Sequence, residues 1–144
     1  MRSIKVLVQK HSLFIEQAIR TRLYNKGTYS DGSRIKTFSA QGSLVYSPFT
    51  VIIKGKKGQP TDRVTLKDTG GFYKTFDTKT GDSEFVNIYD ETTNNGEISD
   101  NVPRLDEAIQ LGQEGMIGLQ ELITEDLRYD FKKEAREAIL HGFE

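Results

Sequence analysis

The chain has 144 residues, 13 glycines, three prolines and no cysteine. The missing cysteines exclude disulfides, thiolate metal sites and cysteine nucleophiles, and no apolar run approaches the roughly 20 residues that a membrane span needs. Residues 1–8 lack the small-residue cleavage site of a secretory signal. We therefore expect one domain, residues 1–144, that is made inside the cell and contains no membrane segment.

The net charge of −1 hides an asymmetry between the two halves of the chain. Residues 1–67 carry 13 Lys/Arg and three acidic residues, a net charge of +10, whereas residues 68–144 carry seven Lys/Arg and 18 acidic residues, a net charge of −11. Such a split is typical of nucleic-acid contact. It equally fits head-to-tail self-association, or two halves of one fold that neutralise each other.

The first expected element is an amphipathic helix over residues 10–26. Its apolar residues, among them Ile15, Ile19 and Leu23, recur every three to four positions, and Gly27 is suited to end it. Residues 4–8 fit either the first turns of this helix or a short strand. A turn is expected at residues 29–33, which contain Asp-Gly.

Residues 34–46 are expected to form a loop, and a helix is expected to begin after Ser47. Serine caps helix N-termini well, and Pro48 would occupy the first helical position, where its missing N–H has no cost. The β-branched residues that follow also fit a strand, but we favour continuation of the helix over residues 51–57. Residues 55–58, Gly-Lys-Lys-Gly, are expected to be a flexible basic loop.

The chain is organised around residues 59–76. Alternation over residues 63–67 predicts a strand, which ends at Asp68 and Thr69, residues that can cap a helix. Phe72, Tyr73 and Phe76 then recur at helical spacing, so we expect strand, capped turn and short helix. These aromatic residues are more typical of a core than of a ligand-stacking platform, and the whole stretch is expected to build a surface for assembly.

The remaining part of the chain predicts one hairpin and two helices. Residues 77–90 are expected to form the hairpin, with its turn at Thr80-Gly81-Asp82, and the polar residues 91–100 a surface loop or mobile arm. A brief helix over residues 105–111 is expected to end at Gly112.

The closing helix is expected over residues 124–140. Thr124 would cap it. An apolar patch of Met116, Ile117 and Leu119, interspersed with Gly115 and Gly118, would precede it. The expected fold is therefore α+β, with N-terminal and C-terminal amphipathic helices packed on a small antiparallel sheet and with long loops or arms.

No pattern in the chain predicts catalysis. His11 and His141 lie at opposite ends and belong to no ligand-spaced cluster, so both are interpreted as solvated residues at helix ends. Asp77 and Lys79 have the acid-x-lysine form of some metal-dependent nucleases, without a defined acidic partner. Residues 55–58 lack the full phosphate-loop pattern. We expect a protein that is not an enzyme and holds no cofactor or metal.

The central stretch resembles tail-completion and virion-morphogenesis proteins of tailed bacteriophages. Residues 57–70 look like the version of this stretch found in phages of Bacteroides-type gut bacteria, including crAss-like phages. In this family a Ser/Thr segment rich in Lys/Arg precedes a leucine-x-aspartate-threonine-glycine motif, and an apolar-glycine-leucine turn leads into the closing helix. The matching pieces are residues 46–50, residues 66–72 and residues 116–119. The chain departs from the pattern at residues 35–43 and 91–100.

The resemblance implies a structural protein of the portal–tail connector (neck), assembled as a homo-oligomeric ring of twelve or six copies. Its partners would be the portal and other neck or tail proteins, and its location the virion, after assembly in the host cytoplasm. An alternative is a DNA-binding accessory protein that contacts phosphates through the basic N-terminal half. The candidate motif and interface residues are Lys54, Lys56, Lys57, Arg63, Asp68, Thr69, Gly70, Phe72 and Tyr73.

Overall fold

A computed structural model describes residues 1–93 and 96–142. Within these residues the helices are α1 (Ile4–Lys10), α2 (Ser12–Lys26), α3 (Pro48–Lys56), α4 (Leu105–Ala108) and α5 (Gln113–His141). Single 3-10 turns are η1 (Tyr73–Thr75) and η2 (Ile98–Asp100). Two antiparallel pairs complete the fold: β1 (Asp77–Thr80) with β2 (Phe85–Ile88), and β3 (Thr92–Thr93) with β4 (Gly96–Glu97). The predicted α+β class is confirmed.

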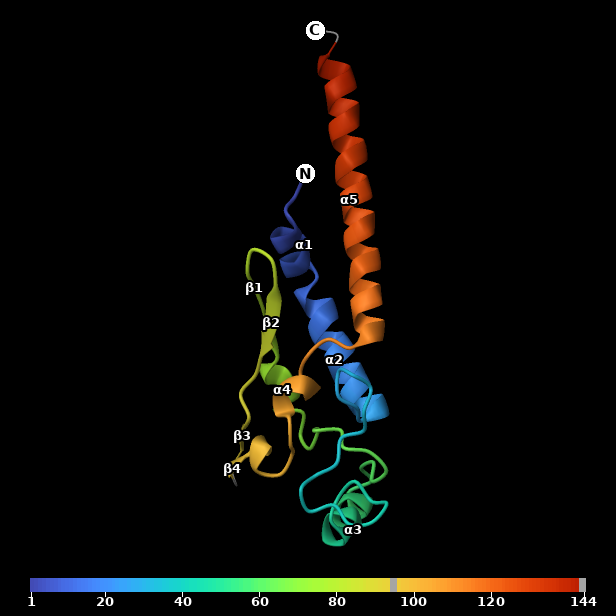
Figure 1. Cartoon of the computed structure of the whole chain (residues 1–144), viewed down its shortest axis with the longest axis vertical. Helices are drawn as coiled ribbons and strands as arrows, with labels where there is room; N and C mark the ends of the chain where they lie inside the picture. The colour runs from blue at the N-terminus through green and yellow to red at the C-terminus, as the bar shows by residue number, and fades with distance from the viewer. Residues whose placement is uncertain (94–95, 143–144) are drawn as a thin grey trace.

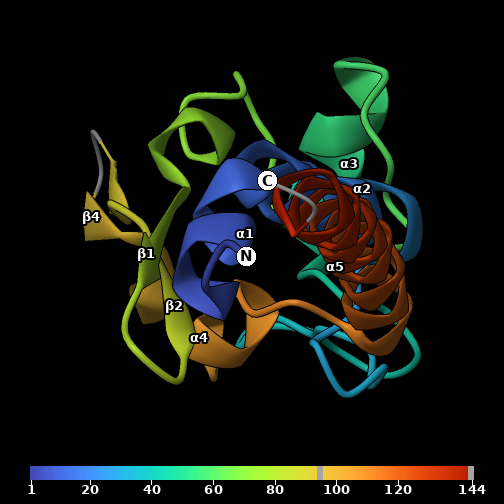
Figure 2. The same ribbon diagram turned by 90° about the horizontal axis from the view of Figure 1, so that it is seen from above.

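The molecule is elongated, with α5 along its upper part and α3 at its lower end (Figure 1). Seen from above, α1 lies between the β1–β2 hairpin and α5 (Figure 2). Both α1 and α2 pack against β1, whereas α5 packs against α1 and α2. The N-terminal helices therefore pack on the small sheet as predicted, while the C-terminal helix packs on those helices.

The N-terminal segment forms two helices, which resolves residues 4–8, left open between helix and strand, as helix α1. Ser3 accepts a hydrogen bond from the backbone N–H of Val6, which places residues 4–10 in a helix. The apolar stripe of α2 is completely buried at Ile15, Ile19 and Leu23. This helix ends at Gly27, whose φ of 60° is left-handed and whose N–H donates to Leu23. The predicted helix and its glycine end are confirmed.

The core is built around the buried face of α2. Side chains from the loops and from α4 close over this face, so segments far apart in the sequence meet there. These include Tyr29, Ile35, Val45, Val64, Tyr73, Phe76, Leu105 and Ile109. Loops thus supply much of the core, because the hairpin is too small to cover the helix.

Helix α3 also begins as predicted. The Ser47 hydroxyl oxygen accepts a hydrogen bond from the N–H of Thr50 at 3.2 Å, and Pro48 is the first helical residue. The basic segment 55–58 is only partly a loop, because Gly55 and Lys56 belong to the last turn of α3. No residue of this helix is fully buried, which leaves most of its surface open to contact.

The predicted strand at residues 63–67 is wrong. The neighbouring residues Val64 and Thr65 are both buried, and Leu66 has a φ of 57°, which a strand cannot contain. The buried Tyr73 hydroxyl donates to the Thr65 carbonyl oxygen and holds this segment as an irregular connection. The predicted helix over residues 72–76 is reduced to the 3-10 turn η1, and no side chain caps it.

The predicted start of the closing helix at Thr124 is also wrong. Thr124 lies inside the 29-residue helix α5, and its hydroxyl donates to the carbonyl of Gln120. Gly115 and Gly118 lie inside the helix. Other side chains approach the helix so closely at these two positions that a Cβ would not fit. A Cβ on Gly118 would lie 2.7 Å from Cζ of Phe14. These glycines therefore permit close helix packing and do not mark a turn.

The polar segment 91–100 lies on the surface, as predicted, but it is ordered by its own side chains. The Ser99 N–H donates to the Glu91 carboxylate, and the Glu97 N–H donates to Asp100. The short β3–β4 pair and η2 lie within this segment. The predicted surface segment therefore contains a short strand pair and a 3-10 turn within the described residues; residues 94–95 lie outside them.

Charged contacts clamp the N-terminal segment onto α5. Arg2 donates to both carboxylate oxygens of Asp130, and the N-terminal amine of Met1 pairs with Glu134. One turn earlier on α5, Asp126 pairs with Lys10 at 2.7 Å. Part of the charge asymmetry is therefore internal neutralisation, one of the three readings of the sequence.

This clamp predicts a loss of stability in acid. The hydrogen bond from Lys10 lowers the pKa of Asp126, and that from Arg2 lowers the pKa of Asp130. A carboxylate with a lowered folded-state pKa stabilises the fold above its unfolded pKa, and that contribution is lost as the pH falls. We expect the free energy of unfolding to decrease below about pH 4. Urea titrations should show a smaller decrease for the Asp126→Asn/Asp130→Asn variant; an equal decrease would contradict the clamp.

Candidate functional site

The lysines singled out in the sequence lie at the α3 end of the molecule, in three different environments. Lys54 is half-buried, with its ammonium 4.9 Å from the centre of the Tyr46 ring, and burial lowers its pKa. Lys57 pairs with Asp68 at 3.5 Å. Lys56 is exposed at the end of the helix. The cluster thus presents less free positive charge than the sequence suggests.

Asp68 joins this lysine cluster and does not cap a helix. The side-chain amide of Gln59 donates to its carboxylate at 3.0 Å, and this bond, with Lys57 nearby, lowers the pKa of Asp68. Its neighbour Thr69 accepts a weak bond from the Gly71 N–H, and Gly70 has the left-handed φ of 89°. The Asp-Thr-Gly motif is therefore a turn that is held at the end of α3 by the contacts of Asp68 with Lys57 and Gln59.

Arg63, Phe72 and Tyr73 have structural roles. The Arg63 guanidinium donates to the carbonyl oxygen of Tyr24 at 2.6 Å. Phe72 is half-buried, with its ring 5.0 Å from that of Phe76 in an edge-to-face arrangement. Tyr73 is buried, and desolvation raises the pKa of its hydroxyl. The aromatic residues are part of the core, as predicted, so Tyr73 is unavailable to a partner.

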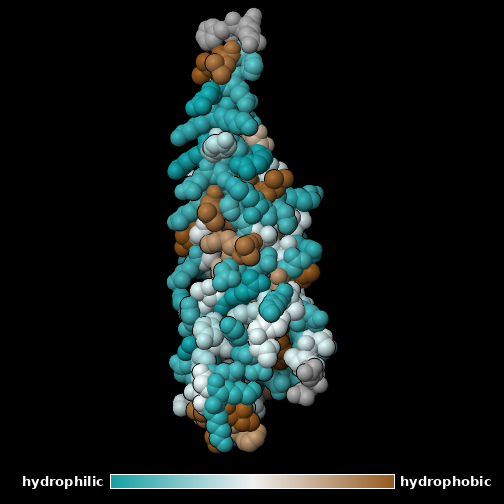
Figure 3. Space-filling model, turned by 180° about the vertical axis from the view of Figure 1, so that it is seen from behind, coloured by the Kyte–Doolittle hydropathy of each residue, from teal (hydrophilic) through white to brown (hydrophobic). Residues whose placement is uncertain are grey.

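Exposed apolar side chains stand beside the lysines on α3. Phe49 is 72% exposed, and Ile52 and Ile53 follow at helical spacing on the same face. Figure 3 shows apolar residues gathered at this lower end of the molecule. We call Phe49, Ile52, Ile53 and Lys56 the α3 tip. Apolar residues beside cations are typical of protein-binding surfaces. The exposure of the α3 tip could not be predicted from the sequence, because a half-buried helix has the same pattern of apolar residues.

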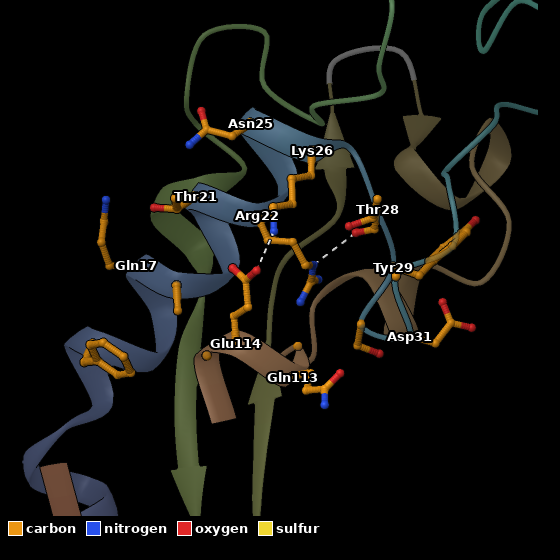
Figure 4. Close-up of a pocket in the computed structure, with 16 residues that line it drawn as sticks. Gln17, Thr21, Arg22, Asn25, Lys26, Thr28, Tyr29, Asp31, Gln113 and Glu114 are labelled. Carbon is orange, nitrogen blue, oxygen red and sulfur yellow. Dashed lines mark hydrogen bonds and ion pairs between the residues drawn. The ribbon is translucent and has the colours of Figure 1, made fainter. Parts of the chain in front are cut away.

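A hollow of about 800 Å³ lies between α2, the turn at residues 28–32 and the start of α5 (Figure 4). The α2 side contributes the polar row Gln17, Thr21 and Asn25, at intervals of four residues. Lys26 and Glu114 form an ion pair of 2.9 Å across it. The four-residue spacing of Gln17, Thr21 and Asn25 is the signal in the sequence that could have indicated this polar face of α2.

Arg22 reaches from α2 into the wall of this hollow. Its guanidinium donates to the carbonyl oxygens of Thr28, Ala108 and Gln110, and burial lowers its pKa. The guanidinium thereby ties α2 to the turn and to the segment after α4. The charged groups of the hollow are engaged in such structural contacts, and no nucleophile–base pair is found among its lining residues.

The described residues contain no group of three His, Asp or Glu side chains placed to hold a metal ion. Asp77 and Lys79, the nuclease candidates, pair with each other at 2.9 Å. His11 is not a solvated histidine as interpreted, because it is half-buried and its Nε2 lies 2.6 Å from Asp126. None of the helices that the structure describes is both long and apolar enough to cross a membrane.

Comparisons of this chain with known protein families, with curated proteins and with solved structures found no match.

Proposed function

We propose that the protein is a non-catalytic structural subunit of the portal–tail connector of a tailed bacteriophage, assembled as a ring. Its partners would be further copies of itself, the portal and other neck or tail proteins. The ring would contain twelve or six copies. The protein would be made in the host cytoplasm and would reside in the neck of the virion.

The observation that carries this proposal is the exposed apolar surface at both ends of an elongated chain. The α3 tip is one surface, and the upper part of α5, with Phe131 64% exposed and Ile139 63% exposed, is the other. A subunit that joins different neighbours needs separate surfaces on one chain. Large exposed apolar residues are costly in a free monomer and are typical of assembly.

Negative-stain imaging and native mass spectrometry of the chain, mixed with the portal and tail proteins of the same virion, test the proposal. We expect ring-shaped complexes with a fixed copy number, attached to the portal. A chain that remains a monomer and binds neither portal nor tail protein would overturn the proposal.

DNA binding has less support. Of the lysines at the α3 end, Lys57 is paired with Asp68 and Lys54 is half-buried, while Phe49 and Ile52 are exposed beside them. Apolar side chains favour a protein surface over phosphates. Salt-sensitive retardation of any duplex in a gel would favour the accessory DNA-binding function, and no retardation at low salt would exclude it.

A further inference from the structure

The exposed half of α5 carries a regular pattern of acid, apolar residue and base. The triplets are Asp126-Leu127-Arg128, Asp130-Phe131-Lys132 and Glu134-Ala135-Arg136. They recur every four residues, so the apolar residues form one stripe. Successive helical residues point about 100° apart, so the stripe has an acidic row on one side and a basic row on the other.

The chain itself covers only the acidic row. Asp126, Asp130 and Glu134 bind the positively charged groups of the N-terminal segment, as described above. Arg128, Lys132 and Arg136 are exposed and make no ion pair with any group in residues 1–93 and 96–142. The basic row therefore lacks the oppositely charged neighbour that the acidic row has.

An open hollow of about 340 Å³ lies beside this stripe. It is lined by Met1, Thr124, Leu127, Arg128, Phe131 and Lys132. Its floor is apolar and its rim contains two members of the basic row. These features suit a partner that presents small apolar side chains bordered by carboxylates.

The β1–β2 hairpin of the same chain presents such a surface. Val86 and Ile88 point outward and are 48% and 44% exposed. Their cross-strand partners on this face, Lys79 and Asp77, neutralise each other in an ion pair of 2.9 Å. The turn of the hairpin carries Asp82 and Glu84, both exposed, and Asp82 pairs only loosely with Lys5, at 3.9 Å. The hairpin and α5 lie on opposite sides of α1 (Figure 2), so one copy cannot join them.

The hairpin turn and the hollow also lie at similar heights along the molecule. Asp82 is next to Lys5 of α1, while Lys10, at the end of the same helix, pairs with Asp126 of α5. Copies placed side by side in the same orientation can thus bring the hairpin of one to the α5 of the next. Two different, complementary faces on opposite sides are what a closed ring requires.

We propose that the outer face of the β1–β2 hairpin docks into the α5 hollow of a neighbouring copy. Val86 and Ile88 contact Leu127 and Phe131, while Asp82 and Glu84 face Arg128 and Lys132. This inference deepens the proposed function and rests on it, because it names the surfaces through which the copies of the ring meet.

Reciprocal charge reversal tests this interface. The variants are Arg128→Glu/Lys132→Glu and Asp82→Lys/Glu84→Lys, at positions that are all exposed. Each variant alone is expected to weaken self-association by at least about ten-fold in analytical ultracentrifugation, because like charges then face each other. A mixture of the two variants, or the fourfold variant, should restore assembly.

The control is Lys36→Glu/Lys133→Glu, which changes the net charge as Arg128→Glu/Lys132→Glu does, at exposed positions that belong neither to the basic row nor to the hairpin. It should assemble as the wild type does, and circular dichroism should show equal helix content in all variants. Two results would overturn this interface while the proposed function stands. In the first, the charge-reversal variants assemble as well as the wild type does. In the second, each variant fails to assemble and mixing the two does not restore assembly. A wild-type chain that stays monomeric overturns the interface as well; if it still binds the portal, it remains a connector subunit.

Discussion

Replacing Arg22 by methionine should lower the free energy of unfolding by about 2–4 kcal/mol. The guanidinium donates to three backbone carbonyls, those of Thr28, Ala108 and Gln110. Methionine has a similar length but no donor, so these acceptors lose their charged partner. Buried polar groups without a partner are costly, and chemical denaturation monitored by circular dichroism measures the loss.

Lys26→Met is the matched control for this substitution. Lys26 lies one turn further along α2, and within the residues that the structure describes its ammonium makes a single ion pair, the exposed one with Glu114. Exposed ion pairs contribute little, so the control should change the free energy of unfolding by about 0.5 kcal/mol or less. Equal effects of the two substitutions would show that Arg22 does not hold these three segments together.

Replacing Gly27 by alanine should destabilise the protein by about 2–3 kcal/mol. Two costs combine at this position. The φ of 60° is unfavourable for any residue with a Cβ, and a Cβ there would lie 2.7 Å from Cβ of Arg63 and 3.0 Å from the backbone N of Val64. The end of α2 and the segment carrying the buried Val64 would have to separate.

Gly42→Ala distinguishes these two costs. Gly42 has nearly the same φ, 58°, but nothing lies within 4 Å of the position of its Cβ. Its substitution should cost about 1 kcal/mol, the cost of the left-handed backbone alone. Thermal unfolding of the two variants measures the difference; if Gly27→Ala is no worse than Gly42→Ala, the close approach to Arg63 contributes nothing.

Part of the charge asymmetry between the two halves of the sequence is neutralised by ion pairs within the chain, and part is not. The N-terminal cations Arg2 and Lys10 neutralise Asp130 and Asp126 within the chain. The lysines after Ser47 are partly neutralised by Asp68. The row of Arg128, Lys132 and Arg136 on α5 makes no ion pair within residues 1–93 and 96–142. Because many charges are neutralised inside the chain, a count over the halves of the sequence overestimates the charge that a partner meets.

Local chemistry made several elements predictable. The stripe of α2, its glycine end, the Ser47 cap of α3 and the β1–β2 hairpin depend on residues a few positions apart. These signals involve residues and backbone groups that are close together in the chain, so the sequence alone is enough to predict the elements that they form. The candidate site was less predictable, because exposure of Phe49 and Ile52 depends on what else covers α3.

The sequence by itself thus determined the α+β class, the amphipathic helix that ends at Gly27 and the position of the hairpin, because cap residues and side-chain periodicity act locally. Only the tertiary structure decided that α5 runs unbroken from Gln113 to His141, since Gly115 and Gly118 are accommodated by Phe14 and Leu111. It also decided that Asp126 and Asp130 of α5 are neutralised, because their partners Lys10 and Arg2 are more than a hundred residues away in the chain. Contacts over such separations depend on how the helices pack, which no local pattern encodes.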